Sequence, residues 1–309
     1  MRLLCLLAAL GLAACTPGGA RRSGLAGPTL LGSDGPLIPT GGGPATEVQR
    51  RAPEAPPMLP PPAANAGPAP APAARPAPAP AADLLATAAR RITVDGMTIS
   101  YLVFDDRRCE IAVADKSAGL NSEWQTAAVA AADHDAIAAI NGGFFTPEGK
   151  PLGLVVENGN LYGAWNGSSS LTSGVLIVTA ARSGLARREK WSPRRPAEHL
   201  LQAGPLLLDA GKAVGGLSKD PERPRSFIAW DGGHHWVIAY VRSASLAGLA
   251  AGLATQPIPE MRLRTALNLD GGSSSDLWIS PAVRGGPVST RQFWNKPVRN
   301  YVIIRERTP

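Results

Sequence analysis

NGGFF at residues 141–145 and NLDGGSSSD at residues 268–276 are two polar turns that each follow a short apolar run. The runs, residues 137–140 and 266–267, predict strands that end in a tight loop. Glycine pairs allow positive φ angles and can bring backbone N–H groups close to a ligand. We therefore expect the two turns to face one another across a pocket for an anionic, hydroxyl-rich molecule.

Asn-Gly and Asp-Gly pairs also form ordinary hairpin turns, so a purely structural role is the alternative. A third turn, Asp231–Gly233, lies between two apolar runs, residues 226–230 and 236–240, that would pair as a simple hairpin. We expect this third turn to be structural. The first two turns differ because Phe144-Phe145 and a triple serine follow them, and neither continues as an alternating strand. A functional role is therefore favoured for those two.

Further segments lie between the two turns in a fixed order. Gly153 precedes VVENG at residues 155–159, and QAGPLL at residues 202–207 and Arg225-Ser226 follow. Together with the two turns, these segments resemble the phosphodiester glycosidase family, from about Ile92 to Ile304. The Arg225 match is looser, because the family usually has Thr where this chain has Ser226. The resemblance implies an α+β fold and hydrolysis of a glycosyl-1-phosphodiester.

That reaction would break the bond between C1 of a sugar and a phosphate oxygen through an oxocarbenium-like transition state. Asp270 is the leading catalytic carboxylate, which would stabilise the charge at C1, attack it or orient water; alternatively, it caps its own turn. The leaving phosphate is already stable as an anion, so a cation matters more than a strong acid. Arg225 suits this role because its planar fork can bind two phosphate oxygens, although it could be a surface residue.

Asn141 completes the expected catalytic set, and Glu157 or Asp276 is the candidate for a second carboxylate. We expect no metal ion and no cofactor, since His234 and His235 are adjacent and would point to opposite faces of a strand. The sequence contains no Gly-x-Ser-x-Gly elbow, so it does not support a serine hydrolase. The expected substrate-binding residues are Gly142, Gly143, Gln202, Gly204, Asn268, Gly271, Gly272 and Ser273, and Trp165, Trp191, Trp278 and Trp294 are candidates for stacking on sugar rings.

The rest of the pattern predicts an α+β class, with a mixed or mainly antiparallel sheet and a few helices. Asp95-Gly96 and Asn158-Gly159 indicate hairpins. A capping box at Ser122 and Gln125 predicts a helix to about Asp133, and residues 245–254 predict a second. The lone cysteine of this region, Cys109, is expected to be a buried strand thiol, with a nucleophile as the alternative.

The N-terminus predicts export and a lipid anchor. Arg2, the apolar residues 3–12 and the box LAAC ending at Cys15 resemble a bacterial lipoprotein signal over residues 1–15. An ordinary secretory signal with a chance cysteine is the alternative. Residues 16–82, rich in Pro, Ala and Gly, are expected to form a disordered tether. Residues 83–309 are long enough for one catalytic domain.

The net charge of +7 comes partly from basic residues around Trp191, in RREK at residues 187–190 and in Arg194-Arg195. This run is either a patch for an anionic polymer or a solvated loop, and the loop is favoured. No nucleic-acid module and no nucleic-acid partner are expected.

We therefore expect a hydrolase, lipid-anchored in the cell envelope and facing the periplasm from the outer membrane if the cell is Gram-negative. Its substrate would be a glycosyl phosphodiester or an envelope polysaccharide. A glycan- or phosphoglycan-binding lipoprotein without turnover, or another envelope hydrolase on the same scaffold, is the alternative.

If Cys15 is lipidated, Cys15→Ala should release the protein from membranes or leave an unprocessed precursor, because the variant lacks the sulfur that carries the lipid. The domain itself should still fold. Membrane fractionation of both proteins, with the cleavage site determined by mass spectrometry, tests this. A wild-type protein that is wholly soluble and cut elsewhere than before Cys15 would contradict the lipoprotein hypothesis.

Overall fold

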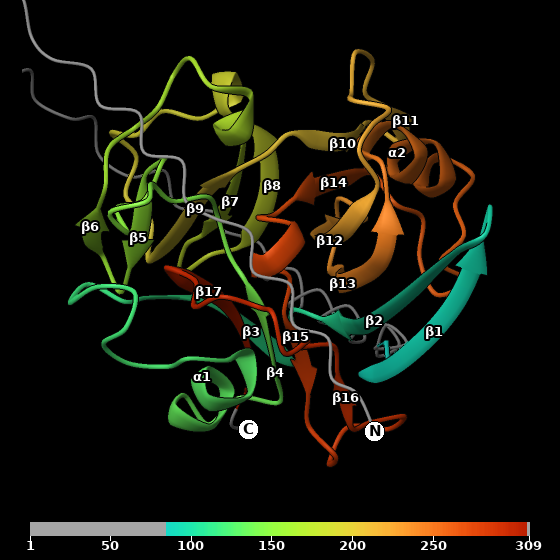
Figure 1. Ribbon diagram of the computed structural model, residues 1–309, viewed down its shortest axis with the longest axis horizontal. Helices are drawn as coiled ribbons and strands as arrows, with labels where there is room; N and C mark the ends of the chain where they lie inside the picture. Colours follow the sequence, from blue (N-terminus) through green and yellow to red (C-terminus); the bar gives the residue numbers. More distant parts are fainter. Residues whose placement is uncertain (1–84, 308–309) are drawn as a thin grey trace, which may run out of the picture. The chain divides into compact units, whose positions relative to one another are not determined.

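This computed structural model describes residues 85–307 of the chain. The strands of this part form three antiparallel sheets (Figure 1). The expected signal, residues 1–15, and the expected tether, residues 16–82, lie outside the described residues. The largely antiparallel strands and the two α-helices confirm the predicted α+β class.

The first sheet has seven strands in the order β1-β2-β13-β12-β14-β10-β11. The hairpin β1–β2 turns at Asp95 and Gly96, whose φ angles are 47° and 76°, so this prediction is confirmed. The turn Asp231–Gly233 joins β12 to β13, as predicted for a structural hairpin. The strands are β1 Ala88–Val94, β2 Met97–Asp105, β10 Leu206–Asp209, β11 Lys212–Ala213, β12 Arg223–Trp230, β13 His235–Ala244 and β14 Thr265–Asn268.

The other two sheets have five strands each, in the orders β16-β15-β4-β17-β3 and β6-β5-β9-β7-β8. The predicted hairpin at Asn158-Gly159 joins β5 to β6. The strands of the second sheet are β3 Cys109–Asp115, β4 Ala138–Asn141, β15 Leu277–Ile279, β16 Val288–Ser289 and β17 Asn300–Glu306, and those of the third are β5 Val155–Glu157, β6 Asn160–Tyr162, β7 Gly174–Val178, β8 Ser183–Arg187 and β9 His199–Ala203.

One apolar cluster receives side chains from all three sheets, among them Ile238, Val302 and Leu176. Strand residues alternate between this cluster and the opposite face of their sheet, as the period of two requires. On β13, for example, Ile238 joins the shared cluster, whereas Val237 packs with a separate group beside α2. Burial of such side chains contributes roughly 1.5–3 kcal/mol each, which makes the shared cluster the main force that holds the sheets together.

Two short helices cover the outer faces of two sheets. Alanines of α1, Ala127–Asp133, pack on β4 and β17, and α2, Leu246–Ala254, packs on β10 and β11 (Figure 1). The predicted start of α2 is confirmed, because the Ser245 hydroxyl accepts a hydrogen bond from the Gly248 amide at 3.0 Å. No described helix is long and apolar enough to cross a membrane.

The predicted start of the first helix is wrong. The Ser122 hydroxyl donates to the Gly119 carbonyl at 2.6 Å, so it caps a turn instead. The helix begins after Thr126, whose hydroxyl accepts from the Val129 amide at 3.1 Å. Cys109 is buried on β3, as predicted, and burial raises the pKa of its thiol.

In the second sheet, a buried ion pair joins the end of β3 to the residue just before β17. Arg299 donates from Nε and Nη2 to Asp115 Oδ1, at 3.0 and 2.6 Å, and from Nη1 to the Gly149 carbonyl at 3.1 Å. The Asp115 side chain is fully buried. The other ion pair of these two strands, Arg305 with Glu110, is about one-third exposed on each side, at 32% and 37%.

Arg299→Ala should lower the free energy of unfolding by about 3–5 kcal/mol, because it leaves the Asp115 carboxylate buried without its partner. The matched control, Arg305→Ala, removes the exposed pair from the same two strands and should cost less than about 1 kcal/mol. Denaturant titration of both variants measures the difference. Equal losses would show that burial does not govern these pairs.

Candidate active site

The side chain of Asn141 joins the two turns, which are 129 residues apart in sequence. Asn141 is the last residue of β4 and is fully buried. Its Nδ2 donates to the Asp270 carbonyl at 2.7 Å, and its Oδ1 accepts from the Asp276 amide at 3.0 Å. Its backbone amide donates to the Asp276 carbonyl at 3.0 Å. The two turns therefore touch directly, whereas a pocket between them was expected.

The glycines of the first turn are also committed to this contact. The Gly142 amide donates to the Asn300 carbonyl at 2.8 Å, and its carbonyl accepts from the Asp270 amide at 2.9 Å. The Gly143 amide donates to Asn300 Oδ1 at 2.8 Å. A Cβ atom at Gly142 would lie only 2.1 Å from that same oxygen. Close packing accounts for both glycines: Gly142 lies against Asn300, and a Cβ atom at Gly143 would lie 2.8 Å from the Gln202 carbonyl oxygen. Their amides are not free to hold a ligand as we had expected.

Gln202, Gly204 and Asn268 likewise make internal contacts. Gln202 Oε1 accepts from the amides of Leu154 and Asn166 at 2.8 and 3.0 Å. Asn268 Nδ2 donates to the Gly204 carbonyl at 2.9 Å, while the buried Asn268 Oδ1 has no hydrogen-bond partner in the described structure. Of these three residues expected to bind substrate, Asn268 and Gly204 fix the start of the second turn, and Gln202 fixes the backbone at Leu154 and Asn166.

Asp270 follows β14 and keeps its side chain at the site. The carboxylate is half-buried, and its Oδ1 accepts from the Gly271 amide at 2.9 Å. Burial raises the pKa of Asp270 to about 6, although hydrogen bonds from the Ser274 hydroxyl and the Gly271 amide act in the opposite direction. The serine that contacts the carboxylate is therefore Ser274; Ser273, the expected ligand residue, accepts from the Lys296 amide through its carbonyl at 3.0 Å.

The turn that follows Asp270 needs its glycines for two different reasons. Gly272 has a φ angle of +65° at the start of the 3₁₀ helix Gly272–Ser274, a conformation that L-residues rarely adopt. A Cβ atom at Gly271 would lie 3.1 Å from the Pro224 carbonyl oxygen and 3.5 Å from Arg225 Nη1. Gly271 therefore lets the guanidinium of Arg225 lie directly against the turn.

Arg225 is a buried cation on β12, so a surface position is excluded. Its Nε and Nη2 donate to the carbonyls of Ala244 and Pro221 at 3.0 and 3.1 Å. No carboxylate of the described chain lies within ion-pair distance of it, Asp270 included. Burial, and then the neighbouring Arg223, lower the pKa of this guanidinium.

The two candidates for a second carboxylate lie in different surroundings. Asp276 Oδ2 accepts from Arg291 Nη1 at 3.0 Å and from the Ala127 amide at 2.9 Å, so it holds the start of α1. Glu157 lies on β5 in the third sheet, where it accepts from the Asp115 amide at 3.2 Å and where burial raises its pKa. Asp270 is the carboxylate next to Gly271, the residue that lies against Arg225.

Sequence reasoning missed Asn300, the contact of Ser274 with the Asp270 carboxylate and, apart from Trp294, the segment that follows Thr290. Asn295 Nδ2 donates to the Ser275 carbonyl at 2.5 Å, which places this segment beside the second turn. At its tip Phe293 is 94% exposed and packs edge-on against Trp294, with ring centroids 4.7 Å apart. A polar Asn300 opening an apolar strand was the one visible signal for the first of these residues.

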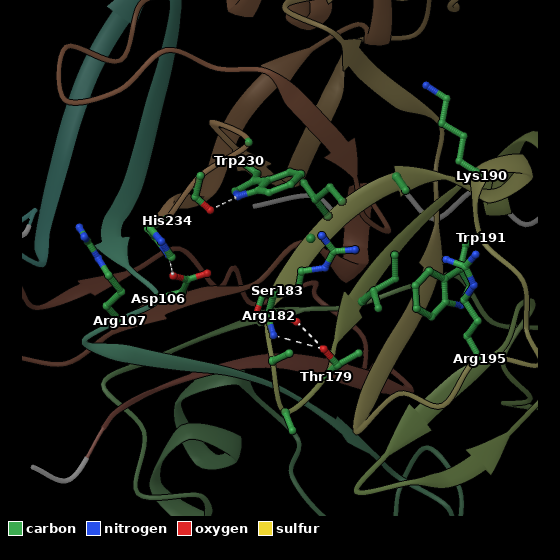
Figure 2. A pocket seen from close by; sticks show the side chains of 18 of the residues that line it. Asp106, Arg107, Thr179, Arg182, Ser183, Lys190, Trp191, Arg195, Trp230 and His234 are labelled. Carbon is green, nitrogen blue, oxygen red and sulfur yellow. Dashed lines mark hydrogen bonds and ion pairs between the residues drawn. The ribbon is translucent and has the colours of Figure 1, made fainter. Parts of the chain in front are cut away.

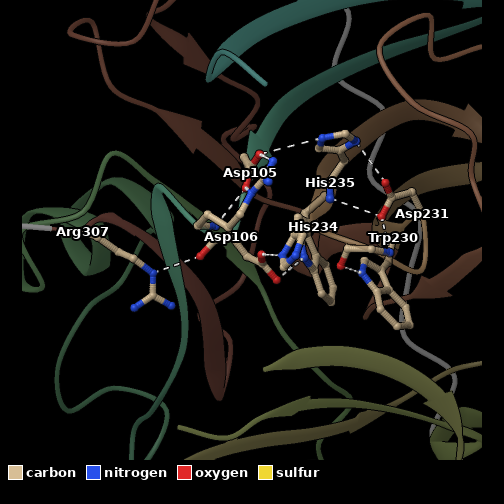
Figure 3. A network of polar contacts seen from close by, with 10 residues as sticks. Asp105, Asp106, Trp230, Asp231, His234, His235 and Arg307 are labelled. Atoms are coloured by element: carbon tan, nitrogen blue, oxygen red, sulfur yellow. Dashed lines mark hydrogen bonds and ion pairs between the residues drawn. The ribbon is translucent and has the colours of Figure 1, made fainter. Parts of the chain in front are cut away.

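Three side chains elsewhere could reach a single metal ion: Asp105, Asp106 and His234. Figure 3 shows them within a network that already satisfies them. Asp105 forms an ion pair with Arg107, and Asp106 accepts from Trp236 Nε1 at 3.1 Å and contacts His234 Nδ1 at 2.7 Å. The polar network explains this cluster without an ion.

Comparisons with known proteins agree with this geometry. A family model described as phosphodiester glycosidase matches residues 134–305, which include both turns and Arg225. The catalytic domain of zebrafish N-acetylglucosamine-1-phosphodiester alpha-N-acetylglucosaminidase, auto-inhibited by its pro-peptide, has a similar fold: the TM-score is 0.52 at 17% identity, over 72% of this chain and 82% of that one.

A hypothetical protein from Synechocystis is also similar, with a TM-score of 0.48 at 18% identity over 71% of this chain and 61% of that chain. No curated protein sequence matches the chain. Because the family model covers more than half of the chain, including every residue of the site, the chain belongs to the phosphodiester glycosidase family.

Proposed function

We propose that this protein hydrolyses a glycosyl-1-phosphodiester, cleaving the bond between C1 of the sugar and a phosphate oxygen. Membership of the phosphodiester glycosidase family supports a glycosidase. The observation that carries the finer proposal is the pair of desolvated charges, Asp270 and Arg225, on either side of the turn at Gly271. They form no ion pair with each other within the described chain.

Arg225 supplies the charge that a phosphate group needs. A buried guanidinium without a carboxylate partner is costly, and an anionic ligand would offset that cost. Two of its nitrogens are held by backbone carbonyls, so the group is already oriented before a ligand binds. Nη1 lies against the turn and is the nitrogen left to meet a phosphate oxygen. This arrangement would stabilise the phosphate as it leaves C1.

Asp270 supplies the opposite charge. Its pKa of about 6 keeps it largely ionised at neutral pH, so it can stabilise positive charge at C1 or activate a water molecule. Ordinary glycosidases use two carboxylates because a poor leaving group must be protonated. A phosphate leaving group removes most of that need, which suits a site with one carboxylate and one cation at the same turn.

We further propose that the enzyme acts in the cell envelope, held there through Cys15 and residues 16–82. The LAAC box and the Pro-, Ala- and Gly-rich composition support this location. The zebrafish relative is named for an N-acetylglucosamine-1-phosphodiester substrate. A compound of that class is therefore the first substrate to test.

Asp270→Asn should lower kcat by at least about 10²-fold with little change in substrate affinity, because the negative charge acts mainly in the transition state. Arg225→Lys should impair both binding and turnover, because lysine keeps the charge but cannot bond the two backbone carbonyls and reach a phosphate oxygen at the same time. Release of free sugar from an N-acetylglucosamine 1-phosphodiester measures turnover, and calorimetry measures binding.

Asp95→Asn is the matched control, since it makes the same chemical change in the β1–β2 hairpin and should leave kcat unaltered. Normal turnover by Asp270→Asn would overturn the catalytic assignment. A wild-type protein that binds the phosphodiester without cleaving it would favour the glycan-binding alternative.

The raised pKa of Asp270 also predicts a stability change with a definite pH dependence. The carboxyl titrates at about 6 when folded and near 3.8 when unfolded, so its ionisation destabilises the fold progressively as the pH rises through this window. Asp270→Asn removes that cost and should raise the free energy of unfolding at pH 7 by on the order of 2–3 kcal/mol. Below about pH 4 the gain should vanish, because both states of the wild type are then protonated.

Thermal unfolding of wild type and Asp270→Asn between pH 3.5 and 8 measures this difference. A gain that is the same at every pH would mean that the carboxylate is not desolvated in the folded protein.

A further inference from the structure

A basic cavity of about 1070 Å³ lies at the end of the β12–β13 hairpin that carries Trp230 (Figure 2). On β12, Trp230 pairs with Thr265 of β14, whereas Phe227 pairs with Asn268, two residues before Asp270. The cavity and the Asp270 turn therefore lie at opposite ends of these strands. Trp230 lies five positions along β12 from Arg225, which corresponds to roughly 17 Å along the strand.

The walls of the cavity come from four places in the sequence. They are the β7–β8 turn, the segment around Trp191, the β12–β13 turn and the β2–β3 turn, with Arg307 beside them. The residues of Asp270's turn do not line it. It is thus separate from the site proposed for catalysis.

Unpaired cations dominate these walls. Arg182, Lys190, Arg195 and Arg307 line the cavity, and none of them forms an ion pair with another described residue. The acidic side chain in the lining, Asp106, is engaged with His234 and Trp236. The cavity therefore has an excess of positive charge that only an external anion can balance.

The structure divides the basic run for which the sequence favoured a solvated loop. Arg187 pairs with Asp209 at 2.5 Å, and Arg188 pairs with Glu189 at 3.0 Å. Lys190 and Arg195 have no such partner and line the cavity on either side of Trp191. Two of the five basic residues of the run are thus paired, and two others line the cavity.

Two indole rings complete the cavity. Trp230 stacks on Trp236, with centroids 5.5 Å apart and an interplanar angle of 21°, and its Nε1 donates to the Gly233 carbonyl at 2.8 Å. The guanidinium of Arg195 lies 5.6 Å from the centre of the Trp191 ring. Both rings are partly exposed and held in place, so they can pack against the C–H faces of a sugar ring.

We propose that this cavity binds a phosphate-bearing glycan chain, with sugars against Trp191 and Trp230 and phosphates on Arg182, Lys190 and Arg195. Guanidinium groups suit phosphate because they can donate two hydrogen bonds to it at once. The charges and the indole rings require an anionic ligand with flat apolar faces. The choice of a glycan over a nucleic acid rests on the proposed function, whose substrate is itself a sugar phosphate.

The test uses phosphorylated dextran as the probe and unmodified dextran as its neutral counterpart, with binding followed by calorimetry at low salt. Lys190→Ala/Arg195→Ala should weaken binding of phosphorylated dextran by about tenfold or more, because two charge-assisted contacts are lost. Lys212→Ala/Arg262→Ala removes the same two residue types from outside the cavity and should change binding less than about twofold. Unmodified dextran should bind much more weakly to the wild type.

Turnover of a small N-acetylglucosamine 1-phosphodiester separates this proposal from the catalytic one. The cavity variant should cleave the small substrate as the wild type does, and a failure of catalysis leaves the binding result interpretable. Equal losses in the two double variants, or no binding of phosphorylated dextran by the wild type, would overturn the cavity proposal. Tighter binding of an oligothymidylate of equal charge would also overturn it in favour of a single-stranded nucleic-acid site.

Discussion

The hydrogen bonds of the Asn141 side chain hold the candidate active site together. One amide group satisfies the carbonyl of Asp270 and the amide of Asp276, and both Asn141 and Asp276 are buried. An unsatisfied buried polar group costs about 1–3 kcal/mol, so any other path for this loop would be penalised at both ends. The contact also joins β4 to the loop that leaves the seven-stranded sheet. The position of Asp270 is therefore fixed by packing between sheets, without help from its own side chain.

Because neutral groups hold the site in place, its two charged side chains have no counter-ion within the described chain. The main chain of Asp270 is engaged with Gly142 and Asn141, while its carboxylate has a neutral hydroxyl and one amide as partners. Arg225 is held by neutral carbonyls. Both groups lose hydration on folding and gain no counter-ion within the described chain, which lowers stability. Charges kept in such an unfavourable state are typical of sites whose ligand supplies the missing partner.

The local parts of this fold were predictable, because their causes lie within a few residues. The hairpin at Asp95-Gly96 and the cap at Ser245 depend on backbone conformation and on one nearby hydroxyl. The roles of Gly142 and Gly143 were not, because a glycine required by a close neighbour looks the same in sequence as one required by a ligand. That neighbour is Asn300 for Gly142 and the Gln202 carbonyl for Gly143, and both are far from the turn in sequence. The residues of the family motifs come together in the fold, but most of them build the backbone around Asp270.

The strands β12, β13 and β14 connect the two proposed sites, which differ in the exposure of their charged groups. At the Asp270 end, charges are buried, few and oriented by the backbone, as a chemical step requires. At the Trp230 end, charges lie on exposed turns around fixed indole rings, so a ligand can bind there in several registers. Turns vary more easily than the strands that carry them. Under the two proposals, such a scaffold would keep one reaction at the Asp270 end while the Trp230 end adapts to the glycan that binds there.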